Sequence, residues 1–188
     1  SILRLPTVFG ISNRTRFDVI INSLVYDIYK HGKVNLLRNG KQKRPFVHIK
    51  DVARAFEFFI HTKPSLINNK IFNVGEEKNN INLIKLTKLI FKTLNKKDSI
   101  NWYGKSDDRS YHVSFKKIKK LGYKCKYDIT YGIKEIYKKI NKKLVIPKIK
   151  NYNIKWLEKL RFIEKNIYRK KNIKLNQKDI KEYNIIKM

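Results

Sequence analysis

Apolar residues in the first part of the chain form short continuous runs that alternate with stretches of helical spacing. Residues 2–9 are a β-branched and apolar run, which is typical of a buried strand. After a polar, basic loop, apolar residues recur at helical spacing over 17–28, and Gly32 predicts the end of that helix because glycine readily adopts a left-handed cap. Residues 34–37 predict a second short strand.

The stretch from Gly40 to Phe59 has the strongest pattern. It begins with a turn and a basic cluster, continues through a short apolar segment, and predicts a helix whose N-cap is Asp51. The residues expected on the buried face of this helix are Val52, Ala55, Phe56 and Phe59. Arg44 and His48 stand just before the helix, where anionic groups are readily held. A plain strand-turn-helix with a solvated arginine is the alternative.

The second half of the chain continues this alternation. Its predicted elements are a strand at 70–74, a helix capped by Asn82, an extended segment at 100–103, a two-turn helix from Ser114 to Gly122, and a helix from Thr130. Short strands separated by helices indicate the α/β class.

The character of the sequence changes near residue 143. Residues 148–188 are rich in Lys, Asn and Ile, and their pattern predicts one amphipathic helix over 156–167 and a weakly patterned tail from about Lys170. We therefore expect two domains, residues 1–143 and a basic, mostly helical extension at 144–188.

Composition adds a formal net charge of +30, which fits binding of nucleic acid, an acidic membrane surface or anionic substrates. The lysines are spread along the chain, as a coding sequence rich in A and T would also produce. Because no run of 18 apolar residues is present, we expect no membrane span and a cytoplasmic protein. The lone Cys125 and four scattered histidines predict no disulfide within the chain and no metal site. The chain starts inside a strand-like segment, so we expect a fragment of a longer protein.

The motifs that mark many catalytic sites are absent. The sequence contains no G-x-G-x-x-G, Walker loop, H-E-x-x-H or G-x-S-x-G motif. Arginine is scarce whereas lysine is abundant, so retained arginines hint at planar, bidentate contacts to phosphate or carboxylate groups. The arginines concerned are Arg14, Arg16, Arg44 and Arg109. Structural ion pairs are the alternative.

Five segments, taken in order, resemble one family. They are LRLPTVFG (3–10), RPFVHIKDVARA (44–55), FNVG (72–75), DDRSYHVSFKKIKKLGY (107–123) and ITYGIKEI (129–136). Their order and spacing resemble the C-terminal half of an extended short-chain dehydrogenase/reductase of the NAD-dependent nucleotide-sugar epimerase/dehydratase family. The resemblance covers roughly residues 2 to 140.

This resemblance implies the C-terminal portion of a Rossmann-type doubly wound sheet plus a small mixed α/β subdomain that binds the nucleotide sugar. It also implies NAD or NADP as cofactor and a homodimer in the full-length form. The family's glycine-rich turn and Tyr-x-x-x-Lys pair would lie upstream of this chain, so we expect no catalytic residue here and no activity of the chain alone. The Tyr26–Lys30 pair falls in a later helix and does not match the catalytic pair.

The resemblance also implies roles for particular residues. Pro6 and Val8 match positions near the nicotinamide, and Arg44 matches the arginine that holds the diphosphate. The residues expected to bind the substrate are Thr7, Arg16, Asn22, Arg44 and Arg109. Thr7 stands where many members have Asn, and the loop before Arg109 departs from the usual Pro-Gly. His48 and Asp51 match a structural strand-to-helix junction. The competing hypothesis is a basic nucleic-acid-binding module, which predicts one continuous basic face.

Overall fold

A computed structural model describes residues 1–107 and 109–168. The chain divides into two compact units, Ser1–Ile146 and Pro147–Met188. The first unit ends at Ile146, three residues beyond residue 143, where the change in composition predicts the boundary. The assignment of a function to each unit stays a prediction.

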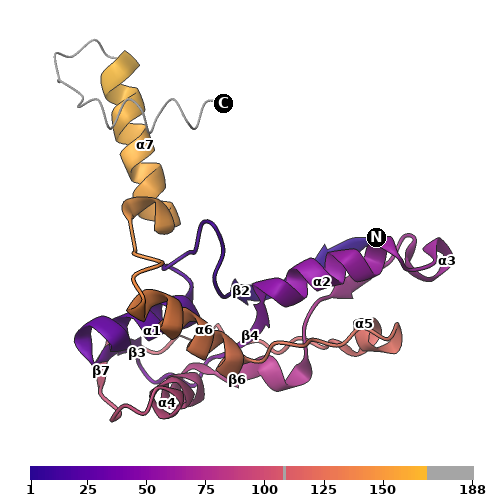
Figure 1. Cartoon of the computed structure of the whole chain (residues 1–188), viewed down its shortest axis with the longest axis horizontal. Coiled ribbons are helices and arrows are strands. Elements are labelled where there is room, and N and C mark those ends of the chain that lie inside the picture. The colour runs from indigo at the N-terminus through magenta and orange to yellow at the C-terminus, as the bar shows by residue number, and fades with distance from the viewer. Residues whose placement is uncertain (108, 169–188) are drawn as a thin grey trace. The chain divides into compact units, whose positions relative to one another are not determined.

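The first unit contains three small sheets (Figure 1). Their parallel pairs are β1 (Ile2–Arg4) with β5 (Ile71–Asn73), β2 (Thr7–Phe9) with β4 (Lys43–His48), and β3 (Val34–Leu37) with β7 (Ile100–Tyr103). A short strand that the sequence pattern did not reveal, β6 (Asn80–Asn82), pairs antiparallel with the start of β4. This arrangement agrees with the predicted α/β class.

The predicted strand over residues 2–9 is two strands that join different sheets. Pro6 lies between β1 and β2 and has no backbone N–H to donate to a ladder. The strand therefore leaves its partner β5 and, from Thr7 onward, pairs with β4, with Thr7 opposite Phe46 and Phe9 opposite His48. This switch places β2 beside the junction between β4 and the next helix.

Helices connect the strands and follow the last one. They are α1 (Ile20–His31), α2 (Ile49–Ile60), α3 (Pro64–Ile67), α4 (Leu83–Thr93), α5 (Lys116–Lys120), α6 (Ile129–Asn141) and, in the second unit, α7 (Asn153–Tyr168), with short 3-10 turns η1 (Glu77–Asn79) and η2 (Ile149–Asn151). Two predicted caps are confirmed. Gly32 ends α1 with φ 67°, and the Asn82 side chain accepts from the Lys85 backbone N–H at 2.9 Å.

Three predicted helix starts are wrong. The α2 N-cap is His48, whose imidazole accepts from the Lys50 N–H, and not Asp51, because β4 runs directly into the helix. Asp128, rather than Thr130, caps α6 through the Tyr131 N–H at 2.7 Å. Helix α5 begins at Lys116 with Phe115 at its N-cap, one residue after the predicted Ser114.

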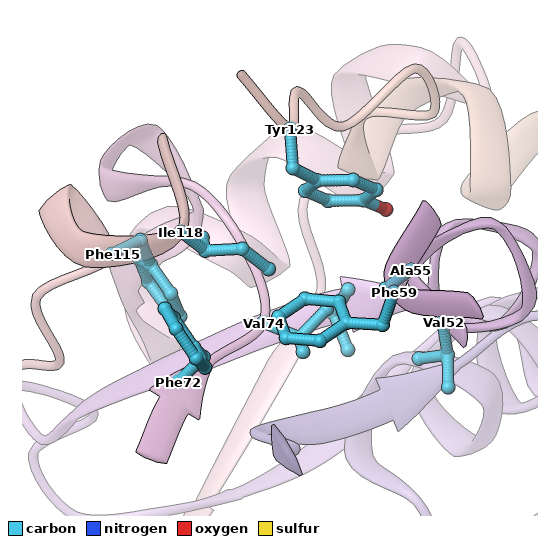
Figure 2. Packing of buried hydrophobic residues seen from close by; sticks show 9 residues of the cluster. Val52, Ala55, Phe59, Phe72, Val74, Phe115, Ile118 and Tyr123 are labelled. Carbon is cyan, nitrogen blue, oxygen red and sulfur yellow. The ribbon is translucent and has the colours of Figure 1, made fainter. Parts of the chain in front are cut away.

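One described hydrophobic core cluster joins α2 to β4, β5 and α5 (Figure 2). Its buried members are Val47, Val52, Ala55, Phe59, Phe72, Val74, Phe115, Ile118 and Tyr123. The Phe59 and Phe72 rings meet edge to face with centroids 5.0 Å apart. Phe56 was predicted on this face but is 51% exposed. On the helix surface Phe56 points about 100° away from Ala55. The core cluster packs only against the face of α2 that Ala55 and Phe59 share.

In the second unit, helix α7 confirms that the predicted segment is helical. Of its predicted apolar stripe, Ile163 is buried, whereas Leu157 is 49% exposed. The weakly patterned tail predicted from Lys170 lies outside the described residues. Among residues 1–107 and 109–168, no helix is long and apolar enough to cross a membrane.

Candidate functional site

A cavity of about 640 Å³ opens where β2 ends and the chain turns toward α1. It brings together six of the seven residues that the sequence singled out for binding: Pro6, Thr7, Val8, Arg16, Asn22 and Arg44. Arg14, Ser12 and Leu83 also contribute to its wall. The seventh predicted residue, Arg109, is outside the lining but contacts Arg44, as described below.

The position of the cavity follows from the sheet. The cavity follows β2 from Pro6 to Gly10 at its carboxyl end, an edge where α/β proteins commonly bind ligands, and it reaches Arg44 near the start of the parallel strand β4. Gly10 ends β2 with φ 111°, and a Cβ atom there would lie 2.7 Å from the His48 Nε2. Only glycine lets the chain leave the strand this close to His48.

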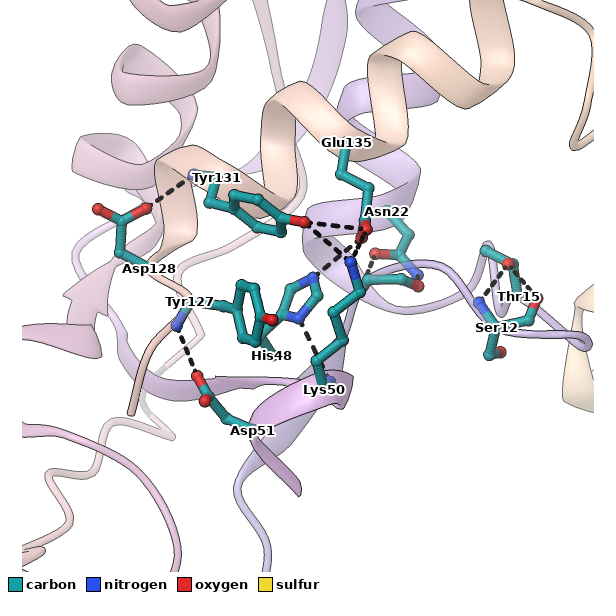
Figure 3. Close-up of polar contacts among 11 residues, drawn as sticks. Ser12, Thr15, Asn22, His48, Lys50, Asp51, Tyr127, Asp128, Tyr131 and Glu135 are labelled. Atoms are coloured by element: carbon teal, nitrogen blue, oxygen red, sulfur yellow. Dashed lines mark hydrogen bonds and ion pairs between the residues drawn. The ribbon is translucent and has the colours of Figure 1, made fainter. Parts of the chain in front are cut away.

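Asn22 organises the loop that forms one wall of the cavity (Figure 3). Its side chain is buried; Oδ1 accepts from the Gly10 N–H at 3.1 Å, and Nδ2 donates to the carbonyl oxygens of Gly10 (3.3 Å) and Arg16 (2.8 Å). Both amide hydrogens are therefore engaged by backbone. Thr15 tightens the same loop, since its hydroxyl accepts from the Ser12 N–H and donates to the Ser12 carbonyl.

Arginine side chains give the cavity its charge. Arg16 forms a two-point ion pair with Asp18 at 3.0 and 3.1 Å, and its side chain is 48% exposed. Arg44 is more enclosed, with 17% of its side chain exposed, and its guanidinium lies 5.1 Å from the centre of the Tyr111 ring. It contacts the Asp107 carboxylate at 3.2 Å and the carbonyl oxygens of Lys43 and Arg109.

The Asp107 carboxylate also binds Arg109. Arg109 Nε donates to Oδ1 at 2.9 Å and Nη2 donates to Oδ2 at 3.1 Å, while 83% of the Arg109 side chain is exposed. These hydrogen bonds from Arg109, and the nearby charge of Arg44, lower the pKa of Asp107 below its ordinary value. Asp107 is therefore an anion held between the two predicted substrate-binding arginines, Arg44 and Arg109.

A second polar cluster joins the end of β4 and the start of α2 to α6 (Figure 3). The buried His48 ring contacts Glu135 through Nε2 at 3.1 Å, and Lys50 contacts both Glu135 and the Tyr131 hydroxyl, the latter at 2.8 Å. Burial lowers the pKa of His48, although the Glu135 charge opposes this. Burial opposes ionisation of Glu135, but its hydrogen bonds with Lys50 and His48 outweigh that effect and lower its pKa.

Reasoning from the sequence missed this role of Glu135. The residue lies in a lysine-rich amphipathic helix, where a lone glutamate usually faces solvent. One signal was available in Gly132, three residues earlier on the same helix. A Cβ there would lie 2.3 Å from the Phe9 ring, so α6 packs closely against β2. A glycine inside a helix often marks such an approach.

The site can bind an anionic, polar ligand. It offers guanidinium groups, the Thr7 hydroxyl and an apolar edge formed by Pro6 and Val8. Within the described part of the chain, no group of three or more His, Cys, Asp or Glu side chains could hold a metal ion. The Tyr26–Lys30 pair does not line the cavity; Tyr26 packs on Phe17 with ring centroids 5.4 Å apart.

Comparison with protein families adds an independent observation. Residues 1–75 match the model of the NAD dependent epimerase/dehydratase family. A relative in sequence is the bifunctional polymyxin resistance protein ArnA of Wigglesworthia glossinidia brevipalpis, which is 31% identical over 71 residues. That match covers 38% of this chain and 11% of the ArnA protein.

Solved structures share the fold. The UDP-glucuronic acid 4-epimerase of Bacillus cereus, in complex with UDP-glucuronic acid and NAD, is 23% identical with a TM-score of 0.63 over 76% of this chain and 45% of its own. The dTDP-glucose 4,6-dehydratase of Bacillus anthracis, in complex with NAD, is 20% identical with a TM-score of 0.61, and the match covers 74% of this chain and 44% of that structure. The UDP-glucose 4-epimerase of Thermotoga maritima, with UDP-glucose, is 22% identical with a TM-score of 0.61, and the match covers 76% of this chain and 46% of that structure.

These identities establish the fold, and this chain spans less than half the length of each of the three structures. The family match and the shared Rossmann-type α/β architecture agree with the order of motifs along the chain. Residues 1–75 therefore resemble the NAD dependent epimerase/dehydratase family in sequence, and the chain shares the fold of these solved structures.

Proposed function

We propose that this chain supplies the nucleotide-sugar-binding part of an NAD(P)-dependent epimerase/dehydratase. The observation that carries the proposal is the cavity at the end of β2, where Thr7, Arg16 and Arg44 meet although they are up to 37 residues apart (44 minus 7). Solved structures with this fold are complexes with UDP-glucuronic acid and UDP-glucose, which support a ligand of this class.

Arg44 is the proposed diphosphate ligand. Its guanidinium is largely shielded from water, which strengthens electrostatic attraction, and its planar fork suits phosphate oxygens. Arg109 adds a second, more exposed guanidinium beside it. Thr7 and Arg16 are proposed to face the sugar. Asn22 acts mainly through the loop, because its amide hydrogens hold Gly10 and Arg16.

The cofactor would meet this chain at the apolar edge formed by Pro6 and Val8. That edge fits the flat, weakly polar face of a nicotinamide ring. The sequence contains no G-x-G-x-x-G loop to cradle the dinucleotide phosphates, so residues outside this chain would hold them. When bound, NAD or NADP would accept a hydride from the sugar. The chain's own contribution is to bind the nucleotide sugar and orient it toward that edge.

We further propose that the chain alone binds ligand without turnover, because the cavity holds no Tyr-x-x-x-Lys pair. Homodimerisation of the full-length form is part of the same proposal. The high net charge of +30 favours the alternative, a nucleic-acid-binding module. The dispersion of lysines over α1, α2, α4, α5, α6 and α7 argues against it, because such a module needs one continuous basic face.

Calorimetric titration of the chain with UDP-glucuronic acid tests the proposal. Arg44→Ala should weaken binding by about 1.5–3 kcal/mol, the range for a hydrogen bond to a charged group. Arg38→Ala, which removes an exposed arginine outside this cavity, is the matched control and should bind like the wild type. Equal affinity of the Arg44→Ala and Arg38→Ala proteins would contradict the assignment. Duplex DNA binding that falls steeply with salt would favour the nucleic-acid alternative.

A further inference from the structure

One carboxylate lies between the two arginines proposed to grip the ligand phosphates. Asp107 follows β7, whereas Arg44 belongs to β4, 63 residues earlier in the chain. The Asp107 side chain is only 12% exposed, although it belongs to a surface loop. Folding therefore brings an internal anion to the guanidinium that lines the cavity.

The contacts of Asp107 reproduce those that arginines make with phosphate groups. Arg109 binds both carboxylate oxygens, through Nε and Nη2, and Arg44 donates a third hydrogen bond through Nη2. Two-point contacts of this kind are the preferred geometry for both carboxylate and phosphate. Meanwhile Arg44 Nη1 is engaged by the carbonyl oxygens of Lys43 and Arg109. A phosphate that approaches the Nη2 edge of Arg44 therefore competes with Asp107.

We propose that Asp107 is an affinity- and specificity-determining residue, an internal anion that occupies the guanidiniums of Arg44 and Arg109 until a ligand phosphate replaces it. This inference rests on the proposed function for the identity of the natural ligand. A diphosphate carries more charge than one carboxylate and can displace Asp107, whereas a sugar carboxylate alone cannot. The residue would thus select ligands that carry a diphosphate over free uronic acids.

Two further features favour exchange over a permanent structural tie. The Arg109 side chain is 83% exposed, so its pair with Asp107 is weak, as exposed ion pairs generally are. If the Arg44–Asp107 ion pair breaks, the cation–π contact with Tyr111 still holds the Arg44 guanidinium. Removal of the Asp107 charge should therefore free the arginines without displacing Arg44 from the cavity wall.

The test is calorimetric titration of the full chain with four probes: UDP-glucuronic acid, UDP, inorganic pyrophosphate and glucuronic acid. Asp107→Asn keeps the shape of the side chain and should bind UDP and pyrophosphate about two- to fivefold more tightly, the factor by which the pair between Asp107 and the exposed Arg109 competes. Asp107→Glu restores the carboxylate and should return affinity toward the wild-type value. Glucuronic acid, whose carboxylate cannot displace Asp107 in the wild type, should bind Asp107→Asn more tightly than the wild type, because the arginines are then free for either anion.

The matched control is Asp98→Asn, which changes the net charge equally at an exposed residue outside the cavity. Gains of equal size in Asp98→Asn and Asp107→Asn would show a general charge effect and overturn the inference. Unchanged or weaker pyrophosphate binding by Asp107→Asn would also overturn it and make Asp107 a scaffold residue. The proposed function fails separately, if Arg44→Ala binds UDP-glucuronic acid as the wild type does.

Discussion

Two carboxylates in this protein each lie between two basic side chains, but their surroundings differ. Glu135 joins His48 and Lys50 at the junction between β4 and α2, and Asp107 joins Arg44 and Arg109 beside the cavity. The carboxylates are shielded to a similar degree, with 14% and 12% of their side chains exposed. The most buried partner of Glu135 is His48, which is fully buried, beside Lys50 at 41% exposed; Asp107 has Arg44 at 17% and Arg109 at 83% exposed.

The comparison indicates that the partner, more than the carboxylate, decides what an ion pair does. His48 is packed against Phe9, Tyr127 and Tyr131, so loss of its contact with Glu135 would leave a buried polar group without a partner. The Arg109 side of Asp107 exchanges readily with water or with an incoming anion. We therefore expect the Glu135 cluster to stabilise the fold and the Asp107 cluster to control binding.

Substitution of His48 is expected to have the largest effect on the stability of the fold. His48→Ala should lower the free energy of unfolding by about 3 kcal/mol, because it opens a cavity among aromatic rings and removes the cap of α2. Urea denaturation followed by circular dichroism measures this change. His112→Ala alters an exposed histidine and should stay within about 0.5 kcal/mol of the wild type. A similar small loss for His48→Ala would mean that the cluster adds little to stability.

Removal of the charge at each carboxylate compares the two clusters directly. Glu135→Gln should cost about 1–2 kcal/mol of unfolding free energy, since His48 and Lys50 then face a neutral amide in place of a carboxylate. Asp107→Asn should cost less stability than Glu135→Gln, because the Arg109 partner of Asp107 is 83% exposed. The same denaturation experiment measures both variants. Equal losses in the two variants would remove the distinction drawn between the clusters.

The smallest expected effect is a dependence on pH. Burial lowers the pKa of His48, so the unfolded chain binds the proton more readily than the folded protein. The stability that comes from neutral His48 is complete above about pH 6.5, the ordinary histidine value, and decreases as the pH falls below it. Free energies of unfolding at pH 7.5 and 5.5 should show this decrease, and His48→Gln should reduce it. An unchanged slope in that variant would point to other groups.

Local features were the ones that could be predicted from the sequence. The Gly32 and Asn82 caps depend on neighbours within a few residues, and both are present in the structure. The cap at Asp51 failed because that carboxylate is engaged elsewhere: it accepts from the Lys126 and Tyr127 N–H groups at 2.8 and 2.9 Å. Propensity for a cap cannot reveal a partner 75 residues away.

The sequence by itself determined the α/β class, most of the elements and, through the order of its motifs, the resemblance to the epimerase/dehydratase family. These properties are set by local spacing and by residue order, which the chain displays directly. Only the tertiary structure decided that Glu135 meets His48, 87 residues apart, and that Asp107 meets Arg44, 63 residues apart. The reason is physical: such pairs form when strand pairing and helix packing close long loops, and nothing in the local pattern around either residue specifies which distant partner will arrive.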